Sequence, residues 1–403
     1  MTGLDKIKAT IAVFGIVFAV APASAEPFAR APLQNIIYSH GVPHAGVCQD
    51  RHRPGFAHCH ARAVTNALGY VAQSSTTSTV APAGYGPTEL RAAYAVPANA
   101  GSPSTTIAII DAFGYYNAES DLAVYRATYG LPPCTTANTC FKKVNQRGST
   151  TNLPAMDIGW AEEAALDLDM ASAMCPQCKI LLVQASSDSY ANLAAAVNMA
   201  AALGAHVISN SYGGAESGTQ RYEPAYNHPS IAIVASSGDS GYGTQFPASS
   251  PHVIAVGGTS LTSAEQTARG WTESAWDGSG SGCSDVYPKP AWQHDQNCTH
   301  RMIGDVAAVA DPATGVAVYA PTGLRTAAWQ IYGGTSVAAP LVAGIYGANG
   351  GIVGWGDPYA NPGALFDILS GTNGTCAVAY HCNAVVGYDG PTGLGTPNGL
   401  SAF

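Results

Sequence analysis

Short apolar segments alternate with helical ones through the middle of this chain, and this order constrains the fold most. We expect buried strands at residues 106–111, 179–184, 206–209, 230–235 and 252–256. Residues 160–174 and 190–203 have the apolar content of helices, and Gly204 suits a helix C-terminus. Strands that alternate with helices pair in parallel, so we predict an α/β fold with a doubly wound, mostly parallel sheet and helices on both faces.

Polar residues stand at the carboxyl ends of three expected strands. Asp111, Asn210 and Asp239 each follow an apolar run. Ligands of such sheets bind beyond the carboxyl ends of the strands, so we expect the functional site at this edge.

The first 25 residues have the layout of a secretory signal peptide. Lys6 and Lys8 precede an apolar run over residues 9–21, and Ala23-Ser24-Ala25 provides a small-residue cleavage site. The alternative is an N-terminal membrane anchor, for which the run is short. We therefore expect a secreted protein, extracellular or periplasmic, with no membrane association after signal cleavage.

Residues 26–84 differ in composition from the remainder, which we treat as one domain over residues 85–403. They contain five of the eleven histidines with two cysteines, and residues 74–82 have the composition of a flexible linker. We expect a short pro-segment or a small disulfide-bridged appendage. The alternative, a metal site around His58-Cys59-His60, matches no standard zinc spacing.

Ten cysteines in an exported chain predict disulfides. They fall into sequence neighbours, and we prefer those pairings: Cys48 with Cys59, Cys134 with Cys140, Cys175 with Cys178, Cys283 with Cys298, and Cys376 with Cys382. The Cys175-x-x-Cys178 spacing also allows a redox pair or half a zinc site, but it lacks a second such motif.

Charged residues are few, and acidic residues outnumber basic ones. Only 11% of residues are charged, with 17 Lys plus Arg against 26 Asp plus Glu. Without a basic patch the chain is not expected to bind nucleic acid. Few ionisable groups also limit self-repulsion in acid.

A pair of glycines brings Ser336 to the start of an apolar helical segment, in Gly333-Gly334-Thr335-Ser336-Val337-Ala338-Ala339-Pro340. This turn exposes the hydroxyl at the positive end of a helix dipole, where an alkoxide or oxyanion is stabilised. We interpret Ser336 as a nucleophile; the alternative is a helix N-cap.

A serine nucleophile needs a base, and no histidine lies in the interval between Asp111 and Ser336 in a setting typical of a catalytic histidine. Glu163 and Asp167 do lie there, four residues apart on one face of the 160–174 helix. The apolar neighbours on this helix predict a buried carboxylate pair that shares a proton, rather than a solvated polar face.

These motifs, in this order, resemble the sedolisins. The family pattern is Glu-x-x-x-Asp on a helix, Ser-Gly-Asp-Ser-Gly after a strand, and Gly-Gly-Thr-Ser-x-x-x-Pro before a late helix. The resemblance runs from about Tyr85 to the C-terminus and includes residues 246–251 and 310–315. It implies a subtilisin-like fold and a serine-carboxyl peptidase that cuts peptide or protein substrates in acid, as an endopeptidase or an exopeptidase.

The resemblance also implies roles. Ser336 would form the acyl-enzyme, Glu163 would act as general base, and Asp167 would orient Glu163. Asp239 would contribute to the oxyanion hole with the Ser336 N–H, and it must be protonated to donate a hydrogen bond; the alternative for Gly-Asp-Ser-Gly is a plain turn. We expect Asp111 to support the wall of the site. Asp169 is expected to be supporting or solvated.

A structural calcium ion is expected near the C-terminus, again by resemblance. Asp367, Ile368, Val385, Gly387 and Asp389 would provide two carboxylates and three carbonyls. The family usually has glycine in place of Val385, so its carbonyl can serve only if the valine avoids a positive φ.

The front of the chain departs from the family, which usually has a long pro-domain. About sixty residues stand here instead, so self-activation by pro-domain removal is not implied. We expect a monomer. Two competing hypotheses remain: a histidine-dependent subtilisin-like hydrolase, and a secreted binding protein that keeps the fold without catalysis.

Overall fold

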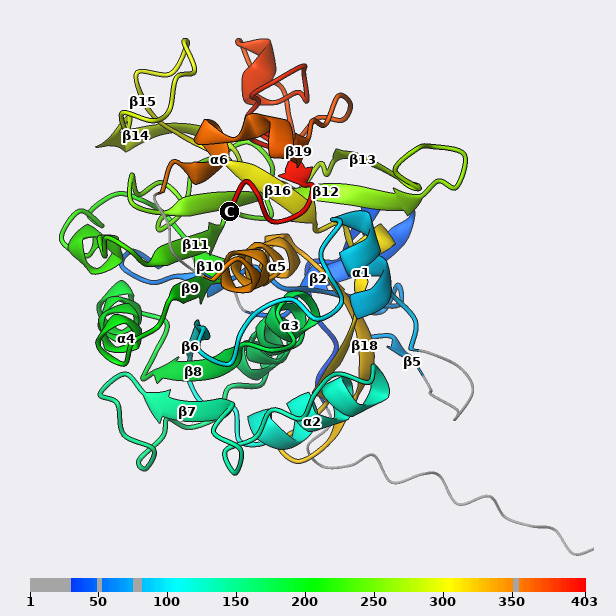
Figure 1. Cartoon of the computed structure of the whole chain (residues 1–403), viewed down its shortest axis with the longest axis vertical. Helices are drawn as coiled ribbons and strands as arrows, with labels where there is room; N and C mark the ends of the chain where they lie inside the picture. Colours follow the sequence, from blue (N-terminus) through cyan, green and yellow to red (C-terminus); the bar gives the residue numbers. More distant parts are fainter. Residues whose placement is uncertain (1–29, 49–52, 75–81, 351–354) are drawn as a thin grey trace, which may run out of the picture.

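The computed structural model describes residues 30–48, 53–74, 82–350 and 355–403 (Figure 1). The predicted signal peptide lies outside these residues. Across the described ranges, no helix combines the length and apolar character that crossing a membrane would require.

An eight-stranded, mostly parallel sheet forms the centre. Its order is β13 (Trp271–Ala275), β12 (Ile254–Ser263), β11 (Ala232–Ser236), β9 (Val207–Asn210), β6 (Thr106–Ala112), β8 (Lys179–Ala185) and β7 (Phe141–Asn145), with β16 (Val306–Val309) beside β12. Only β13 pairs antiparallel with its neighbour. The predicted fold class is confirmed, and four of the five predicted strands are found within about two residues of their expected ends, whereas β12 continues seven residues beyond the predicted end at residue 256.

Long helices pack on this sheet. The helix α3 (Ile158–Met174) packs on β6 and against α5 (Thr335–Ala348), which itself lies over β9, β11 and β12. The helix α4 (Tyr190–Ala202) packs on β6 and β8. Because α5 begins directly after a sheet strand and α3 lies beside it, residues of both helices meet in the interior. Shorter helices are α1 (Pro87–Ala93), α2 (Ala118–Thr128) and α6 (Asp357–Ala360).

A second sheet joins the N-terminal residues to the strand before Ser336. Its order is β1 (Ile37–Ser39), β2 (Val42–Gly46), β4 (Arg62–Val64), β18 (Ala327–Gly333) and β17 (Val316–Pro321), with β5 (Gln73–Ser74) also on β18. Arg62 pairs antiparallel with Gly333. The described part of residues 26–84 therefore shares a sheet with the peptidase-like region, and its processing stays a prediction.

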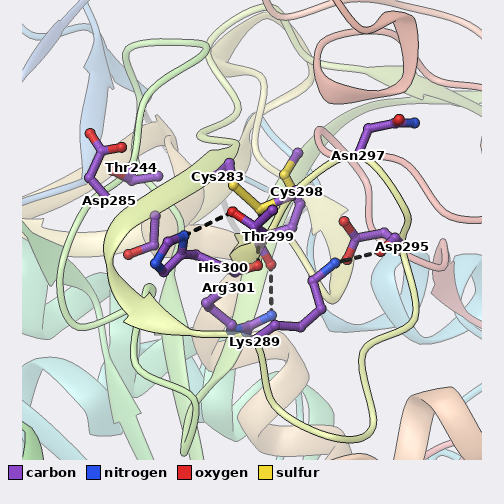
Figure 2. The surroundings of a disulfide bond; sticks show 12 residues. Thr244, Cys283, Asp285, Lys289, Asp295, Asn297, Cys298, Thr299, His300 and Arg301 are labelled. Atoms are coloured by element: carbon purple, nitrogen blue, oxygen red, sulfur yellow. Dashed lines mark hydrogen bonds and ion pairs between the residues drawn. A yellow bond between two sulfur atoms is a disulfide. The ribbon is translucent and has the colours of Figure 1, made fainter.

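Five disulfides join the predicted neighbours, so the preferred pairings are confirmed: Cys48–Cys59, Cys134–Cys140, Cys175–Cys178, Cys283–Cys298 and Cys376–Cys382. The Cys283–Cys298 bond connects β14 (Gly282–Pro288) to the loop before β15 (His300–Ile303), as Figure 2 shows. Lys289 and Asp295 form an ion pair at 2.8 Å within the same loop.

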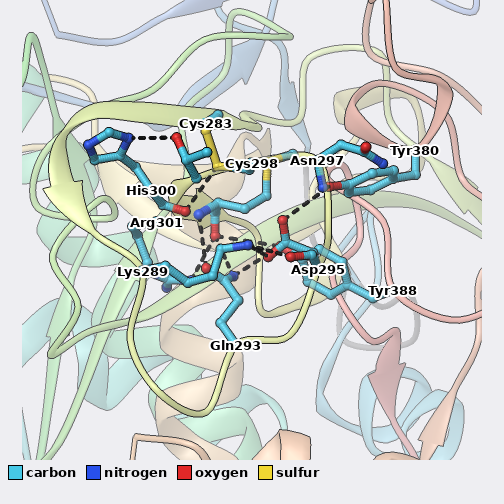
Figure 3. Close-up of polar contacts among 12 residues, drawn as sticks. Cys283, Lys289, Gln293, Asp295, Asn297, Cys298, His300, Arg301, Tyr380 and Tyr388 are labelled. Carbon is cyan, nitrogen blue, oxygen red and sulfur yellow. Dashed lines mark hydrogen bonds and ion pairs between the residues drawn. A yellow bond between two sulfur atoms is a disulfide. The ribbon is translucent and has the colours of Figure 1, made fainter.

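Polar contacts fasten this loop to the C-terminal region (Figure 3). The Tyr380 hydroxyl donates to Asp295 Oδ2 at 3.0 Å, and Gln293 Nε2 donates to the Tyr388 hydroxyl at 3.2 Å. The segment that carries the predicted calcium ligands is thus held against the body of the protein. The remaining short strands are β3 (His58–Cys59) with β10 (Tyr212–Gly213), and β19 (Leu365–Phe366) with β20 (Thr396–Pro397).

Candidate active site

Gly334 makes the turn that delivers Ser336 into the interior. It is the N-cap of α5 and has a φ of 93°, a conformation that favours glycine. A Cβ atom at this position would lie 1.9 Å from the His60 carbonyl oxygen and 2.7 Å from Asp239 Oδ2. Glycine is therefore required both by the backbone and by the two oxygens that approach it.

Ser336 is the second residue of α5 and is fully buried. Since Gly334 is the N-cap, the N-cap alternative for Ser336 does not describe this helix. The hydroxyl donates to the Ser211 carbonyl at 3.3 Å. The main-chain N–H groups of a first helical turn have no partner within the helix. The N–H of Ser336 is therefore suited to bind a developing oxyanion.

Glu163 and Asp167 lie buried on α3, which Asp157 caps by accepting a hydrogen bond from the Trp160 N–H at 3.1 Å. Burial and the nearby Asp111 carboxyl raise the pKa of both groups well above the usual range, while the Ser336 hydroxyl acts to lower the pKa of Glu163. The structure thus brings Ser336 and the two carboxyls into one site, and the solvated-face alternative does not apply.

Asp111 is a third carboxyl of this cluster. It is the second-last residue of the strand β6, is 1% exposed, and has a pKa raised by burial. Its charge acts on both Glu163 and Asp167. Sequence reasoning placed it only in the wall of the site. Its position at the carboxyl end of an apolar strand was the sequence signal that pointed to a larger electrostatic role.

Asp239 follows β11 and faces the same turn from the other side. Its Oδ1 accepts hydrogen bonds from the N–H and hydroxyl of Thr335, at 2.7 and 2.9 Å. Burial raises its pKa to about 6, although the Arg62 cation and the Thr335 hydrogen bonds act in the opposite direction. Among the residues that the structure describes, none hydrogen-bonds to Oδ2, which lies near Gly334.

His58 and His60 both reach this region, and His58 acts to lower the pKa of Asp239. The two ring nitrogens of His60 lie 2.6 Å from Ser236 Oγ and 2.9 Å from Gln245 Oε1. With both nitrogens engaged there, His60 is not placed as the base for Ser336. This arrangement argues against the histidine-dependent alternative.

Asp169 belongs to the framework rather than to the site. It is buried, and its Oδ2 accepts a hydrogen bond from the Tyr319 N–H of β17 at 3.1 Å. Of the two roles expected for it, support is the one that the structure shows.

The predicted calcium ligands lie in one neighbourhood. The Gly387 N–H donates to Asp367 Oδ2 at 2.9 Å, and the Val385 N–H donates to Asp389 Oδ2 at 3.0 Å. Val385 does not have a positive φ, so its carbonyl is not excluded as a ligand. Two neighbouring carboxyls offer the oxygen ligands that a hard ion prefers. Within the described ranges, no cluster of three or more His, Cys, Asp or Glu side chains could hold a metal.

Sequence reasoning missed the N-terminal contribution to the site. The Ala61 N–H donates to Glu163 Oε2 at 2.8 Å, and Arg62 acts on the pKa of Asp239. Both residues come from the segment that was expected to be separate. No local pattern reveals such contacts, because they depend on pairing between residues more than 100 positions apart in the sequence.

Comparisons with known proteins identify related sequences. Residues 149–348 match the subtilase family. The chain is 33% identical to kumamolisin of Bacillus sp. over 79% of its own length and 63% of the relative's, and 28% identical to sedolisin of Pseudomonas sp. over 78% and 60%. It thus spans under two thirds of these relatives.

A solved structure supports the same relationship. It is a Pseudomonas sedolisin, described as a serine-carboxyl proteinase complexed with two molecules of pseudo-iodotyrostatin, which superposes with a TM-score of 0.66 at 26% identity. The match covers 79% of this chain and 96% of that one. By fold, by motif order and by sequence similarity, the chain belongs to the sedolisin family of subtilisin-like proteins.

Proposed function

We propose that this protein is a secreted serine-carboxyl peptidase that hydrolyses peptide bonds in acid through an acyl-enzyme on Ser336. The observation that carries the proposal is the meeting of Ser336 with the buried Glu163 at the first turn of α5. A serine hydroxyl at a helix N-terminus beside a carboxyl of raised pKa is equipped for nucleophilic attack.

Glu163 is proposed to take the proton from Ser336 Oγ as the oxygen attacks the substrate carbonyl carbon. Its raised pKa makes it a stronger base than an ordinary carboxylate, although its base form is less populated in acid. Asp167, protonated because burial and Asp111 raise its pKa, is proposed to orient Glu163 and stabilise the charge of its base form.

The oxyanion is proposed to form between the Ser336 N–H and Asp239 Oδ2. Thr335 donates two hydrogen bonds to Oδ1 of Asp239. Oδ2 is therefore the oxygen that we propose to be protonated and to donate a hydrogen bond into the site. Only the protonated carboxyl donates a hydrogen bond, and a pKa of about 6 makes this form dominant in acid. The collapse of the adduct would return the proton from Glu163 to the leaving nitrogen.

Calcium is proposed as a structural ion at Asp367 and Asp389, with the carbonyls of Ile368, Val385 and Gly387. When bound, it would neutralise the two carboxyls and tie their loops together. We propose that the protein is secreted, because it has five disulfides and an N-terminal sequence typical of a signal peptide. Peptides or proteins are the proposed substrates, and a monomer is the proposed state.

The test is hydrolysis of a fluorogenic peptide library at about pH 4 by the wild type and Ser336→Ala. Ser336→Ala should lose at least about 10³-fold in kcat/KM, and mass spectrometry of the quenched wild type should find an acyl adduct on Ser336. Folded protein without hydrolysis of any peptide would favour the binding-protein alternative.

A further inference from the structure

The ring of His60 fills a small pocket beside the candidate site, formed by three neighbouring segments. His60 is 2% exposed, and its Nδ1 lies 2.6 Å from Oγ of Ser236, the last residue of β11. Its Nε2 lies 2.9 Å from Oε1 of Gln245, in the loop that follows Asp239. The third segment is β10, which lies beside β11 and contributes Gly213 (Figure 1). Both ring nitrogens are therefore paired within this pocket.

The main chain of His60 shows where this pocket lies relative to the nucleophile. The strand β3 pairs antiparallel with β10, so that Cys59 faces Tyr212, and the pairing continues as the His60 N–H donates to the Ser211 carbonyl at 3.2 Å. The His60 carbonyl oxygen lies against Gly334, in the turn that leads to the nucleophile. A peptide that follows β10 with its carbonyl at this turn would therefore place one side chain in the pocket.

Two glycines make room for the Gln245 side chain in the pocket wall. A Cβ atom at Gly213 would lie 2.6 Å from Gln245 Oε1, and one at Gly238 would lie 2.8 Å from Gln245 Nε2. The main chain next to Gln245 is fixed to the same region, because Gly214 and Phe246 exchange hydrogen bonds of 3.2 and 2.9 Å. Gln245 is thus held where its amide faces a ring in the pocket.

The partners in this pocket suit an imidazole ring. An amide oxygen only accepts hydrogen bonds, so Gln245 pairs with a ring nitrogen that carries a proton. The Ser236 hydroxyl can donate to the other nitrogen, or it can accept from it while donating to the Asn210 carbonyl at 3.5 Å. The pocket therefore satisfies both the neutral and the protonated ring. An apolar side chain would leave the Gln245 oxygen without this partner, which is how a polar site rejects an apolar substrate.

We propose that Ser236 and Gln245 are specificity-determining residues, and that the peptidase prefers substrates with a histidine on the acyl side of the bond that it cuts. This inference rests on the proposed peptidase function and names its substrate class. A substrate whose N–H binds the Ser211 carbonyl, as the His60 N–H does, places its own imidazole between the Ser236 hydroxyl and the Gln245 amide.

Peptides that differ only in the residue on the acyl side of the cut bond test this preference at about pH 4. That residue is histidine, phenylalanine, leucine, lysine or glutamate, and the enzymes are the full-length wild type and His60→Gly, whose pocket has no ring of its own. The kcat/KM of the histidine peptide should exceed that of the leucine and phenylalanine peptides at least about tenfold. Gln245→Leu should reduce this ratio at least about tenfold, whereas Gln245→Glu, which keeps an oxygen acceptor, should preserve it.

Binding of free imidazole tests the pocket without catalysis. In the full chain with Ser336→Ala and His60→Gly, imidazole at about pH 7, where it is partly protonated, should raise the Tm in a saturable way by at least about 1 °C. The matched control is Ser336→Ala alone, in which the His60 ring fills the pocket and no such rise is expected. Addition of Gln245→Leu to the double variant should abolish the rise.

The two measurements separate this inference from the proposed function. Equal hydrolysis of the histidine and leucine peptides, or a ratio that Gln245→Leu leaves unchanged, would overturn the histidine preference while the peptidase function stands. Absence of the Tm rise in Ser336→Ala/His60→Gly would overturn the imidazole pocket. If imidazole binds but neither the wild type nor His60→Gly hydrolyses any peptide, the peptidase function is contradicted, whereas Ser236 and Gln245 still form an imidazole pocket.

Discussion

Thr335 holds one oxygen of Asp239 with two hydrogen bonds, from its main-chain N–H at 2.7 Å and from its hydroxyl at 2.9 Å. The other oxygen of Asp239 approaches the turn at Gly334, where the proposed hydrogen bond to an oxyanion would form. The adjacent residue, Ser336, is the proposed nucleophile, so one turn of chain positions both groups.

Asp239→Asn should extend activity toward neutral pH. Burial raises the pKa of Asp239 to about 6, so the donating, protonated form is lost as pH rises through that value. An amide donates at every pH, and kcat/KM of the variant should then lose its decline above about pH 6. Asp239→Ala should cost about 10²–10³-fold at acidic pH. An unchanged alkaline limb in Asp239→Asn would exclude Asp239 as the titrating group.

Thr335→Val should move the alkaline limb of the pH profile of kcat/KM to higher pH. Both Thr335 hydrogen bonds stabilise the ionised form of Asp239 and lower its pKa, and valine removes the hydroxyl. The matched control is Thr335→Ser, which keeps the hydroxyl and should leave the limb in place. A shift of the alkaline limb to lower pH in Thr335→Val would contradict the assignment of this limb to Asp239.

Asp111→Asn should move the acidic limb to lower pH. The Asp111 carboxyl raises the pKa of Glu163, so removal of its charge makes Glu163 easier to ionise. Asp169→Asn is the control, since Asp169 is equally buried but bonds to Tyr319. It should lower the melting temperature without moving the limb. Equal limb shifts in both variants would point to a general loss of packing instead.

Calcium should stabilise the protein chiefly near neutral pH. Burial raises the pKa of Asp389 from 3.8 to about 7, with Asp367 adding to the shift. The stability from this group is therefore present in acid and is lost as pH rises toward about 7, unless a cation binds the ionised form. Thermal unfolding with calcium or a chelator should show a higher Tm with calcium at about pH 7 and a smaller difference at about pH 4. Asp389→Asn should abolish the difference; a calcium effect that persists in it would place the ion elsewhere.

Five strands and two helices between β6 and β12 could be predicted because each carries its own apolar pattern and end signals, whereas α2 and β7 were missed. The buried strand over 106–111 and the Gly204 helix end are examples. The disulfide pairings could also be predicted, since the cysteines come in pairs that lie close together in the sequence.

The candidate site could be predicted from the sequence only in part. Ser336 and Glu163 are 173 positions apart, and the search for a base together with the family resemblance connected them. The strand of residues 58–62 remained hidden, because its partners are the short β10 and the end of β18. Two-residue pairings of this kind carry no periodic signal, and burial of the histidine ring depends on tertiary contacts.

The most direct test of the account is the pH profile of peptide hydrolysis between about pH 3 and 8 for the wild type and Glu163→Ala. The wild type should be most active in acid. Glu163→Ala should fall by at least about 10³-fold across that range. Activity that peaks near neutrality and survives Glu163→Ala would contradict a carboxyl base for Ser336.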